Sequence, residues 1–259
     1  MRIEVSLTPA LYPLRAITTG HTTVAIDVLR ATTAVCAAFQ AGCAEVVPLD
    51  SLEMLPLYRK LGFSSAAERG GKKVGDAEYG NSPTEYLRCD MTGVRLAYST
   101  TNGTRSMLVA ADADCALVGA FANITALVER LRTDGRDTVL LCSGWQGDFC
   151  IEDTLLAGAL LERLSDVAVP HGDAAQMALA LWQTAKDDVY GYCCSHCTHV
   201  GRLEGFGAGQ DVAFAFRQDT CPLVPEMKTE SLDCRIDGLE EGRMSGQPVV
   251  RISNRWARG

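Results

Sequence analysis

The sequence predicts a three-layer α/β fold, with a mostly parallel or mixed central sheet, helices on both faces and a smaller C-terminal region. Short apolar runs alternate along the chain with stretches of helical periodicity, which is the pattern of βαβ crossovers. The runs are apolar at nearly every position, as expected for strands covered on both faces. With 259 residues, 47% of them hydrophobic, the chain is long enough to bury a large core.

Five strand–helix units are expected in the first two thirds of the chain. The apolar runs predict strands at 24–26, 45–49, 95–99, 115–118 and 138–142. The helical stretches after them lie at 33–41, 51–59, 105–111, 124–132 and 152–164. Gly42 and Gly62 end the first two helices, because glycine adopts the left-handed conformation that closes a helix. A long glycine-rich loop joins the second unit to the third and contains a short helix at 84–87.

The pattern changes from residue 170 onward. Helices are expected at 174–186 and 193–203 and a short strand at 248–252, while the signal beyond Gly205 is weak. We therefore expect residues 1–168 to form an α/β core that carries a phosphate and metal site. Residues 169–259 would pack on that core, either as a second unit or as part of one single domain.

Composition and charge exclude several classes of function. The net charge of −8 argues against nucleic acid as a partner, because a basic face is the usual footprint of such proteins. No apolar stretch approaches the ~18 residues of a membrane span, and the first residues do not resemble a signal peptide. Most of the eleven cysteines lie in apolar segments, so we expect reduced thiols and a cytoplasmic location.

The most informative stretch follows the strand at 24–26 and reads Asp27-Val28-Leu29-Arg30-Ala31-Thr32-Thr33. It places a carboxylate, a fixed cation and the unpaired N–H groups of a helix start within a few residues. The N-terminus of a helix favours anions. A carboxylate beside an anion site needs a cation between them, and Mg²⁺ is the usual partner of phosphate. The stretch therefore predicts phosphate chemistry.

Polar residues collect where the predicted strands end. Ligands of open parallel sheets bind beyond the carboxyl ends of the strands. The candidates there are Asp27, Arg30, Thr100, Thr101, Asn102, Gly103, Thr104, Arg105, Ser143, Gly144, Glu152 and Asp153. Taken singly, each hydroxyl is more commonly a helix cap than a ligand. Arg30 and Arg105 are harder to explain in that way, because a cation at a helix start opposes the macrodipole and calls for an anion.

The glycine-rich loop holds a second set of candidates, namely Arg69, Gly70, Gly71, Asn81 and Ser82. Paired glycines let a backbone turn at positive φ or approach a ligand closely, and arginine presents a planar fork to phosphate, sulfonate or carboxylate. A mobile surface loop is the alternative. Asn81 and Ser82 equally suit a cap for the helix at 84–87, with Pro83 in its first position.

A cysteine-rich stretch contains Cys193, Cys194, His196, Cys197 and His199. Cys194 and Cys197 have the spacing of one zinc knuckle, but structural zinc sites generally take two further ligands from a distant pair, and the sequence shows no second pair of cysteines. We therefore expect a helix with several small thiols rather than a zinc site.

Five motifs in order resemble the 2-phosphosulfolactate phosphatase family. They are 27–33, 68–71, 80–83, 100–105, and 143–145 with 152–154, and weaker similarity continues at 201–203, 211–212 and 224–225. The resemblance implies an α/β fold and a Mg²⁺-dependent enzyme that hydrolyses 2-phospho-3-sulfolactate to 3-sulfolactate and phosphate, a step towards coenzyme M. It also implies a homo-oligomer and a small anionic phosphoester as the substrate.

Roles follow for the candidates under this hypothesis. Asp27 would bind Mg²⁺, with Glu152 or Asp153 as a second carboxylate, directly or through water. Arg30 and Arg105 would hold phosphoryl oxygens, and Arg69 would bind the sulfonate or carboxylate. Further hydrogen bonds would come from Asn102, Thr101 and Ser143.

Three alternatives stay open. The substrate could be a related phosphorylated hydroxy acid. The protein could bind such a metabolite without catalysis, although the three carboxylates favour a metal-dependent reaction. An aspartyl phosphate on Asp27 is disfavoured, because Leu29 stands where a second aspartate is usual in such enzymes.

Overall fold

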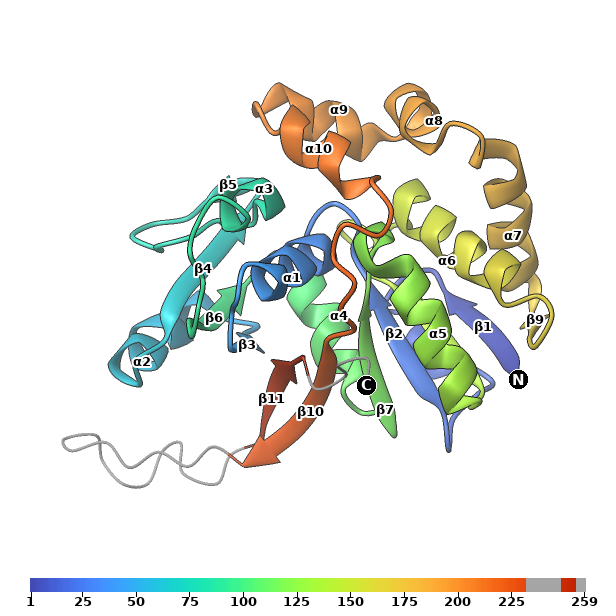
Figure 1. The fold of residues 1–259 in the computed structure, drawn as a ribbon, viewed down its shortest axis with the longest axis horizontal. Coiled ribbons are helices and arrows are strands. Elements are labelled where there is room, and N and C mark those ends of the chain that lie inside the picture. Colours follow the sequence, from blue (N-terminus) through green and yellow to red (C-terminus); the bar gives the residue numbers. More distant parts are fainter. Residues whose placement is uncertain (232–247, 255–259) are drawn as a thin grey trace.

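The computed structural model describes residues 1–231 and 248–254. One mixed sheet of eleven strands runs through this part of the molecule, in the order β5-β4-β6-β3-β11-β10-β7-β2-β8-β1-β9 (Figure 1). Its strands are β1 Arg2–Ser6, β2 Thr22–Ile26, β3 Glu45–Pro48, β4 Ser64–Arg69, β5 Lys72–Lys73, β6 Arg95–Ser99, β7 Cys115–Gly119, β8 Thr138–Cys142, β9 Val169–His171, β10 Glu226–Ser231 and β11 Pro248–Ser253.

Ten α-helices accompany the sheet in the described part of the chain. They are α1 Ala31–Gln40, α2 Leu55–Lys60, α3 Pro83–Tyr86, α4 Gly103–Ala110, α5 Ile124–Asp134, α6 Ile151–Arg163, α7 Asp173–Ala185, α8 Val189–His196, α9 Thr198–Gly205 and α10 Gly209–Ala215. None of these described helices has the length and apolar character needed to cross a membrane.

Strand β2 shows how the three layers form. It lies between β7 and β8, parallel to both, and all five of its residues are buried. Since successive side chains of a strand point to opposite faces, Val24 and Ile26 join a core cluster that includes residues of α5 and α6. Ala25 joins the cluster on the other face, which includes residues of α1 and α4. The expected α/β sandwich with helices on both faces is confirmed.

The prediction of a loop at 62–80 is wrong in part, because this segment contains β4 and β5. Strand β4 reads Ser-Ser-Ala-Ala-Glu-Arg, which lacks the β-branched and aromatic residues that mark a strand, yet it pairs in parallel with β6. Gly70 and Gly71 form the two-residue turn to β5, with φ angles of 61° and 89°. Positive φ at both positions is what such a hairpin turn requires.

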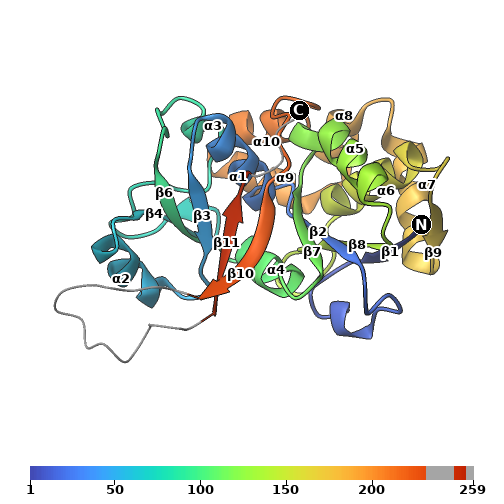
Figure 2. The ribbon, with the colours of Figure 1, turned by 60° about the horizontal axis from the view of Figure 1, so that its bottom comes forward.

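The C-terminal part of the chain contributes to the same sheet. Strand β11 confirms the expected strand at 248–252, and β10 and β11 form an antiparallel pair between β3 and β7 (Figure 2). The single helix expected at 193–203 is instead two, because Cys197 between α8 and α9 is extended, with φ −90° and ψ 114°. Strands β1, β9 and β10 and helix α10 were not expected. The division of the chain at residue 168 stays a prediction.

Candidate active site

A small polar cavity lies beyond the carboxyl ends of β2, β6 and β8, on the side where α9 and α10 lie in Figure 1. Its volume is about 20 Å³, which is enough for one water molecule or ion. Its lining residues are Asp27, Leu29, Arg30, Glu68, Gly71, Asn81, Thr100, Thr101, Asn102, Trp145, His199, Arg202 and Leu203. Seven of the predicted site residues therefore meet here, namely Asp27, Arg30, Gly71, Asn81, Thr100, Thr101 and Asn102.

Asp27 is held rigidly between β2 and α1. Its Oδ1 accepts the N–H of Ala31 at 3.1 Å and its carbonyl accepts the N–H of Thr32 at 3.0 Å. The Thr32 hydroxyl in turn accepts the N–H of Asp27 at 2.9 Å and donates to its carbonyl at 2.8 Å. These two N–H groups, expected to meet a phosphate, are thus satisfied by Asp27 itself.

Gly103 lets α4 approach Asp27. A Cβ atom at this position would lie 2.5 Å from Oδ2 of Asp27 and would also collide with the Cβ of Ala31. Only glycine fits there without displacing the carboxylate. Gly103 therefore shapes the site from behind rather than lining it.

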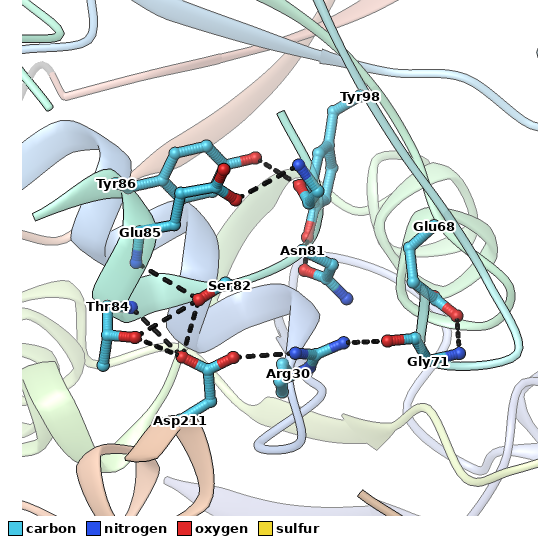
Figure 3. A network of polar contacts seen from close by, with 11 residues as sticks. Arg30, Glu68, Gly71, Asn81, Ser82, Thr84, Glu85, Tyr86, Tyr98 and Asp211 are labelled. Carbon is cyan, nitrogen blue, oxygen red and sulfur yellow. Dashed lines mark hydrogen bonds and ion pairs between the residues drawn. The ribbon is translucent and has the colours of Figure 1, made fainter. Parts of the chain in front are cut away.

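Arg30 is neutralised within the protein by Asp211 of α10. Its Nη1 donates to Oδ2 of Asp211 at 2.7 Å, both side chains are 6% exposed, and Nη2 donates to the carbonyl of Gly71 at 2.9 Å. The other carboxylate oxygen of Asp211 accepts the hydroxyls of Ser82 at 2.7 Å and Thr84 at 2.6 Å (Figure 3). The network joins the loop before α1, the β4–β5 turn, α3 and α10.

Asn81 and Ser82 divide between the two roles expected of them. Asn81 lines the cavity, and its Oδ1 accepts the hydroxyl of buried Tyr98 (Figure 3). Ser82 caps α3, because its Oγ accepts the N–H of Glu85 at 3.1 Å, with Pro83 in the first helical position.

Glu68 is a cavity residue that was not predicted. It is 7% exposed, and its carboxylate accepts the N–H of Gly71. Its neighbour Arg69 does not line the cavity. The Arg69 guanidinium instead donates to the carbonyl of Ser99 at 3.1 Å and to its hydroxyl at 2.9 Å, which ties the end of β4 to the end of β6.

Asp153 supports the loops around the site. Its carboxylate accepts the N–H groups of Val28 at 2.8 Å, Ser143 at 3.2 Å and Gly144 at 3.1 Å. Burial raises its pKa, as do the nearby Asp27 and Glu152 carboxylates. Ser143 and Gly144 therefore meet Asp153 through their backbone, while the buried Ser143 hydroxyl has no partner among the described residues.

Carboxylates crowd around Asp27 and make a cation favourable there. Burial, together with the negative charges of Glu68 and Glu152, raises the pKa of Asp27 to about 6. The carboxylate would thus be partly protonated near neutral pH without a compensating positive charge. Carboxylate oxygens are the ligands that Mg²⁺ prefers, so the residues present fit a magnesium ion.

His199 and Arg202 of α9 are the clearest residues that sequence reasoning missed. A guanidinium only donates hydrogen bonds, so Nε2 of His199 accepts from Nη2 of Arg202 at 2.7 Å, and Nδ1 donates to Oε1 of Glu152 at 2.9 Å. The guanidinium carbon of Arg202 lies 4.5 Å from the ring centroid of Trp145. Its Nε is buried without a partner among the described residues. Glu152 thus reaches the cavity through His199.

Arg105 lies in a neighbouring hollow of about 440 Å³, and its side chain is exposed. Thr100 and Thr101 line both this hollow and the small cavity. Thr104 lines the hollow too, and its N–H is capped by the Thr100 hydroxyl at 3.2 Å. Nine of the predicted residues therefore line either the cavity or the adjoining open hollow.

Comparisons with known proteins show the family to which the chain belongs. A family model described as 2-phosphosulpholactate phosphatase matches residues 6–230. A protein of Synechococcus sp. (strain JA-2-3B'a(2-13)), named "Probable 2-phosphosulfolactate phosphatase", is 39% identical over 213 residues, which are 78% of this chain and 86% of that protein. A protein of the same name from Gloeothece citriformis (strain PCC 7424) is 35% identical over 240 residues, 88% of this chain and 97% of that protein. The resemblance seen in the motifs is confirmed, and the chain belongs to the 2-phosphosulpholactate phosphatase family, a family of phosphoric monoester hydrolases.

Proposed function

We propose that the protein is a Mg²⁺-dependent phosphatase that hydrolyses 2-phospho-3-sulfolactate to 3-sulfolactate and phosphate, a coenzyme M biosynthesis-type step. One observation carries the proposal beyond family membership. The buried carboxylate of Asp27, whose pKa is raised to about 6, shares a small cavity with the guanidinium groups of Arg30 and Arg202. Carboxylate and guanidinium groups together suit a metal ion and a phosphoryl group.

The magnesium ion would be held by Asp27, with Glu152 or Asp153 contributing directly or through water. When bound, it would neutralise phosphoryl charge and help to activate a water molecule. The surrounding side chains support this role by holding Asp27 in place: Ala31 and Thr32 fix its backbone and one carboxylate oxygen. An aspartyl phosphate stays the less favoured route.

Arg202 is the arginine best suited to bind the phosphoryl group. Arg30 already faces the carboxylate of Asp211, whereas Arg202 faces a neutral imidazole and has an unpartnered Nε. Its positive charge is therefore available to an anion, and the face of Trp145 and the Nε2 of His199 hold the guanidinium in place. Arg30 adds its charge to the same wall of the cavity.

The second anionic group of the substrate would lie in the hollow beside Arg105. The hollow adjoins the cavity at Thr100 and Thr101, so a three-carbon frame could cross from one to the other. Arg105 then recognises the sulfonate or carboxylate. Arg69, proposed from the sequence for that task, would position β4 and β6 instead, since its N–H groups are used by Ser99. Asn102 and Thr101 would donate further hydrogen bonds.

Substrate entry requires a movement of α9. The cavity of about 20 Å³ has no room for a phosphoester, and α9 supplies three of its lining residues, His199, Arg202 and Leu203. Their outward displacement would admit the phosphoryl group, and their return would exclude water.

The decisive experiment is a phosphate-release assay on 2-phospho-3-sulfolactate with and without Mg²⁺. We expect turnover that depends on Mg²⁺ and that is lost in Asp27→Asn with the fold intact by circular dichroism. Retained activity in Asp27→Asn would remove the metal role of this residue. Phosphorylated lactate and malate analogues in the same assay test the alternative of a related hydroxy acid. Tight binding of the sulfonated ester by calorimetry without phosphate release would favour a non-catalytic binding protein.

A further inference from the structure

A second group of metal-binding side chains lies behind the cavity. The ligand atoms of Cys150, Glu152 and His199 all lie within 4.8 Å of one another. Cys150 and Glu152 flank the start of α6, and His199 lies in the first turn of α9. A pocket of about 180 Å³ borders these three side chains and is also lined by His196 and Cys197.

The donor atoms distinguish this group from the site at Asp27, and with Glu152 used here Asp153 is left as the second carboxylate for magnesium. A thiolate, an imidazole and a carboxylate are ligands of zinc-like cations, with bond lengths of ~2.0–2.3 Å. Magnesium prefers oxygen ligands alone. A fourth donor is at hand, because Cys197 lines the same pocket as these three side chains. The set thus resembles a four-coordinate zinc site rather than a magnesium site.

The group also explains part of the cysteine-rich stretch. The sequence offers no second pair of cysteines for Cys194 and Cys197, and on that ground it predicts no zinc site. The fold supplies ligands that a search for such a pair does not find, since Cys150 and Glu152 approach His199 from another helix. Cys194 takes no part, because its side chain is exposed on α8.

We propose that Cys150, Glu152 and His199 bind one zinc-class divalent cation, with Cys197 as the fourth ligand. The ion takes the place of the proton that Nδ1 of His199 now donates to Glu152. The thiols of Cys150 and Cys197 release their protons to solvent, while the His199 proton moves to Nε2. There it would face an N–H of Arg202. The ion and the hydrogen bond between Arg202 and His199 therefore exclude each other, and the coordinate bonds outweigh the two hydrogen bonds that His199 loses, to Glu152 and from Arg202.

The test is a titration of the full-length, chelator-treated and reduced protein with Co²⁺, which takes the place of Zn²⁺. Cobalt–thiolate bonds give an absorption band in the near ultraviolet, and we expect it to saturate at about one ion per chain. Addition of Zn²⁺ should abolish the band. In Cys150→Ser the affinity should fall at least about tenfold, while the matched control Cys194→Ser should keep the wild-type titration. No band in the folded wild type, or an unchanged titration in Cys150→Ser, would overturn the proposal.

A second measurement covers the case in which Cys150→Ser does not fold. Wild-type protein, Cys194→Ser and His199→Asn are equilibrated with Zn²⁺, freed of unbound ion by gel filtration and analysed for zinc, with the fold checked by circular dichroism. We expect about one zinc per chain in the wild type and Cys194→Ser and at least about tenfold less in His199→Asn; equal zinc in all three would refute the site. Neither measurement uses a phosphoester, so both can be read whatever the outcome of the phosphatase assay.

Discussion

The guanidinium of Arg30 and the carboxylate of Asp211 form a buried ion pair, with 2.7 Å between Nη1 and Oδ2. The two residues are 181 positions apart in the chain. Since Asp211 also accepts hydrogen bonds from Ser82 and Thr84, one carboxylate fastens α10 to the loop that carries Asp27. The pair thereby positions the helices that close the cavity.

Removal of one partner should destabilise the protein strongly. Asp211→Ala leaves the Arg30 charge buried without its anion, so we expect the free energy of unfolding to fall by about 3–5 kcal/mol. The control is Asp76→Ala, which breaks the pair of Asp76 with Arg59, where Asp76 is 87% exposed and the loss should be much smaller, as for other exposed pairs. Urea unfolding measures both. Equal losses would mean that the buried pair contributes no more than a surface one.

Gly103→Ala should disrupt the site without changing a polar group. The added methyl group collides with Ala31 and the Asp27 carboxylate, so the carboxylate must move and Mg²⁺-dependent turnover should fall by more than about tenfold, since a small misplacement costs that much. Gly209 begins α10, and a Cβ there meets no atom within 4 Å. Gly209→Ala should therefore keep wild-type turnover. Normal kcat and KM in Gly103→Ala would contradict the close approach of α4.

The stability of the metal-free protein should fall as the pH rises from about 4 to about 6. The folded pKa of Asp27 is raised from 3.8 to about 6, so the folded state binds the proton more tightly than the unfolded state over this range. Protonation of Asp27 therefore contributes to the free energy of unfolding. This contribution, roughly 3 kcal/mol, is complete below pH 4 and is lost as the pH rises through 6. Thermal unfolding in a chelator, at a series of pH values, measures it.

Two comparisons test whether Asp27 causes this fall in stability between pH 4 and pH 6. The Asp27→Asn variant cannot ionise at this position, so its stability should fall less between pH 4 and 6. Mg²⁺ should raise the melting temperature of the wild type more at pH 7 than at pH 4, because a cation stabilises only the ionised form. If stability falls equally with pH in the wild type and in Asp27→Asn, other titratable groups cause the pH dependence.

Arg202→Gln should slow the chemical step. If Arg202 binds the phosphoryl group, its loss should lower kcat by about 10²–10³-fold, as for removal of one transition-state donor. Arg132→Gln is a suitable control, because Arg132 forms an exposed ion pair with Asp166 remote from the cavity lining. An unchanged kcat in Arg202→Gln would remove this arginine from the phosphoryl site.

Arg105→Ala should affect recognition of the second anion. We expect the KM for 2-phospho-3-sulfolactate to rise about tenfold or more, which corresponds to the loss of roughly 1.4 kcal/mol of binding. Hydrolysis of a simple aryl phosphate, which has no second anionic group, should be unaffected. An equal loss of kcat/KM on both substrates would instead support a contact between Arg105 and the phosphoryl group, as the sequence suggests.

Local patterns were sufficient to predict much of the sheet. Strands such as β2 and β8 end in apolar runs, at 24–26 and 139–142, and residues after them are found at the site because parallel strands end at one edge. Strand β4 escaped prediction because serine and alanine carry little strand signal, although tertiary pairing with β6 stabilises it. No local pattern marked β10, which pairs with the distant β7 as well as with the following strand β11.

The site was predictable where it follows strand ends or lies in the glycine-rich loop, which supplies Gly71 and Asn81. Asp27 and Asn102 come directly from βα turns, whereas His199 and Arg202 reach the cavity from α9, whose position depends on packing between distant segments. His199 stood out in the sequence only as a neighbour of cysteines. Its contact with Glu152 spans 47 positions, so nothing in its local sequence indicates a role at the cavity.

The hairpin of β10 and β11 has a consequence for synthesis on the ribosome. Strands β3 and β7 have no hydrogen-bonded partner on one side until this hairpin, from the last part of the sequence, is inserted between them. A nascent chain that stops short of residue 226 would hold two half-sheets with unprotected edges, which readily pair with other chains. Assembly of the complete sheet must therefore wait until translation has passed residue 253, and chaperone capture of the growing polypeptide should persist until then.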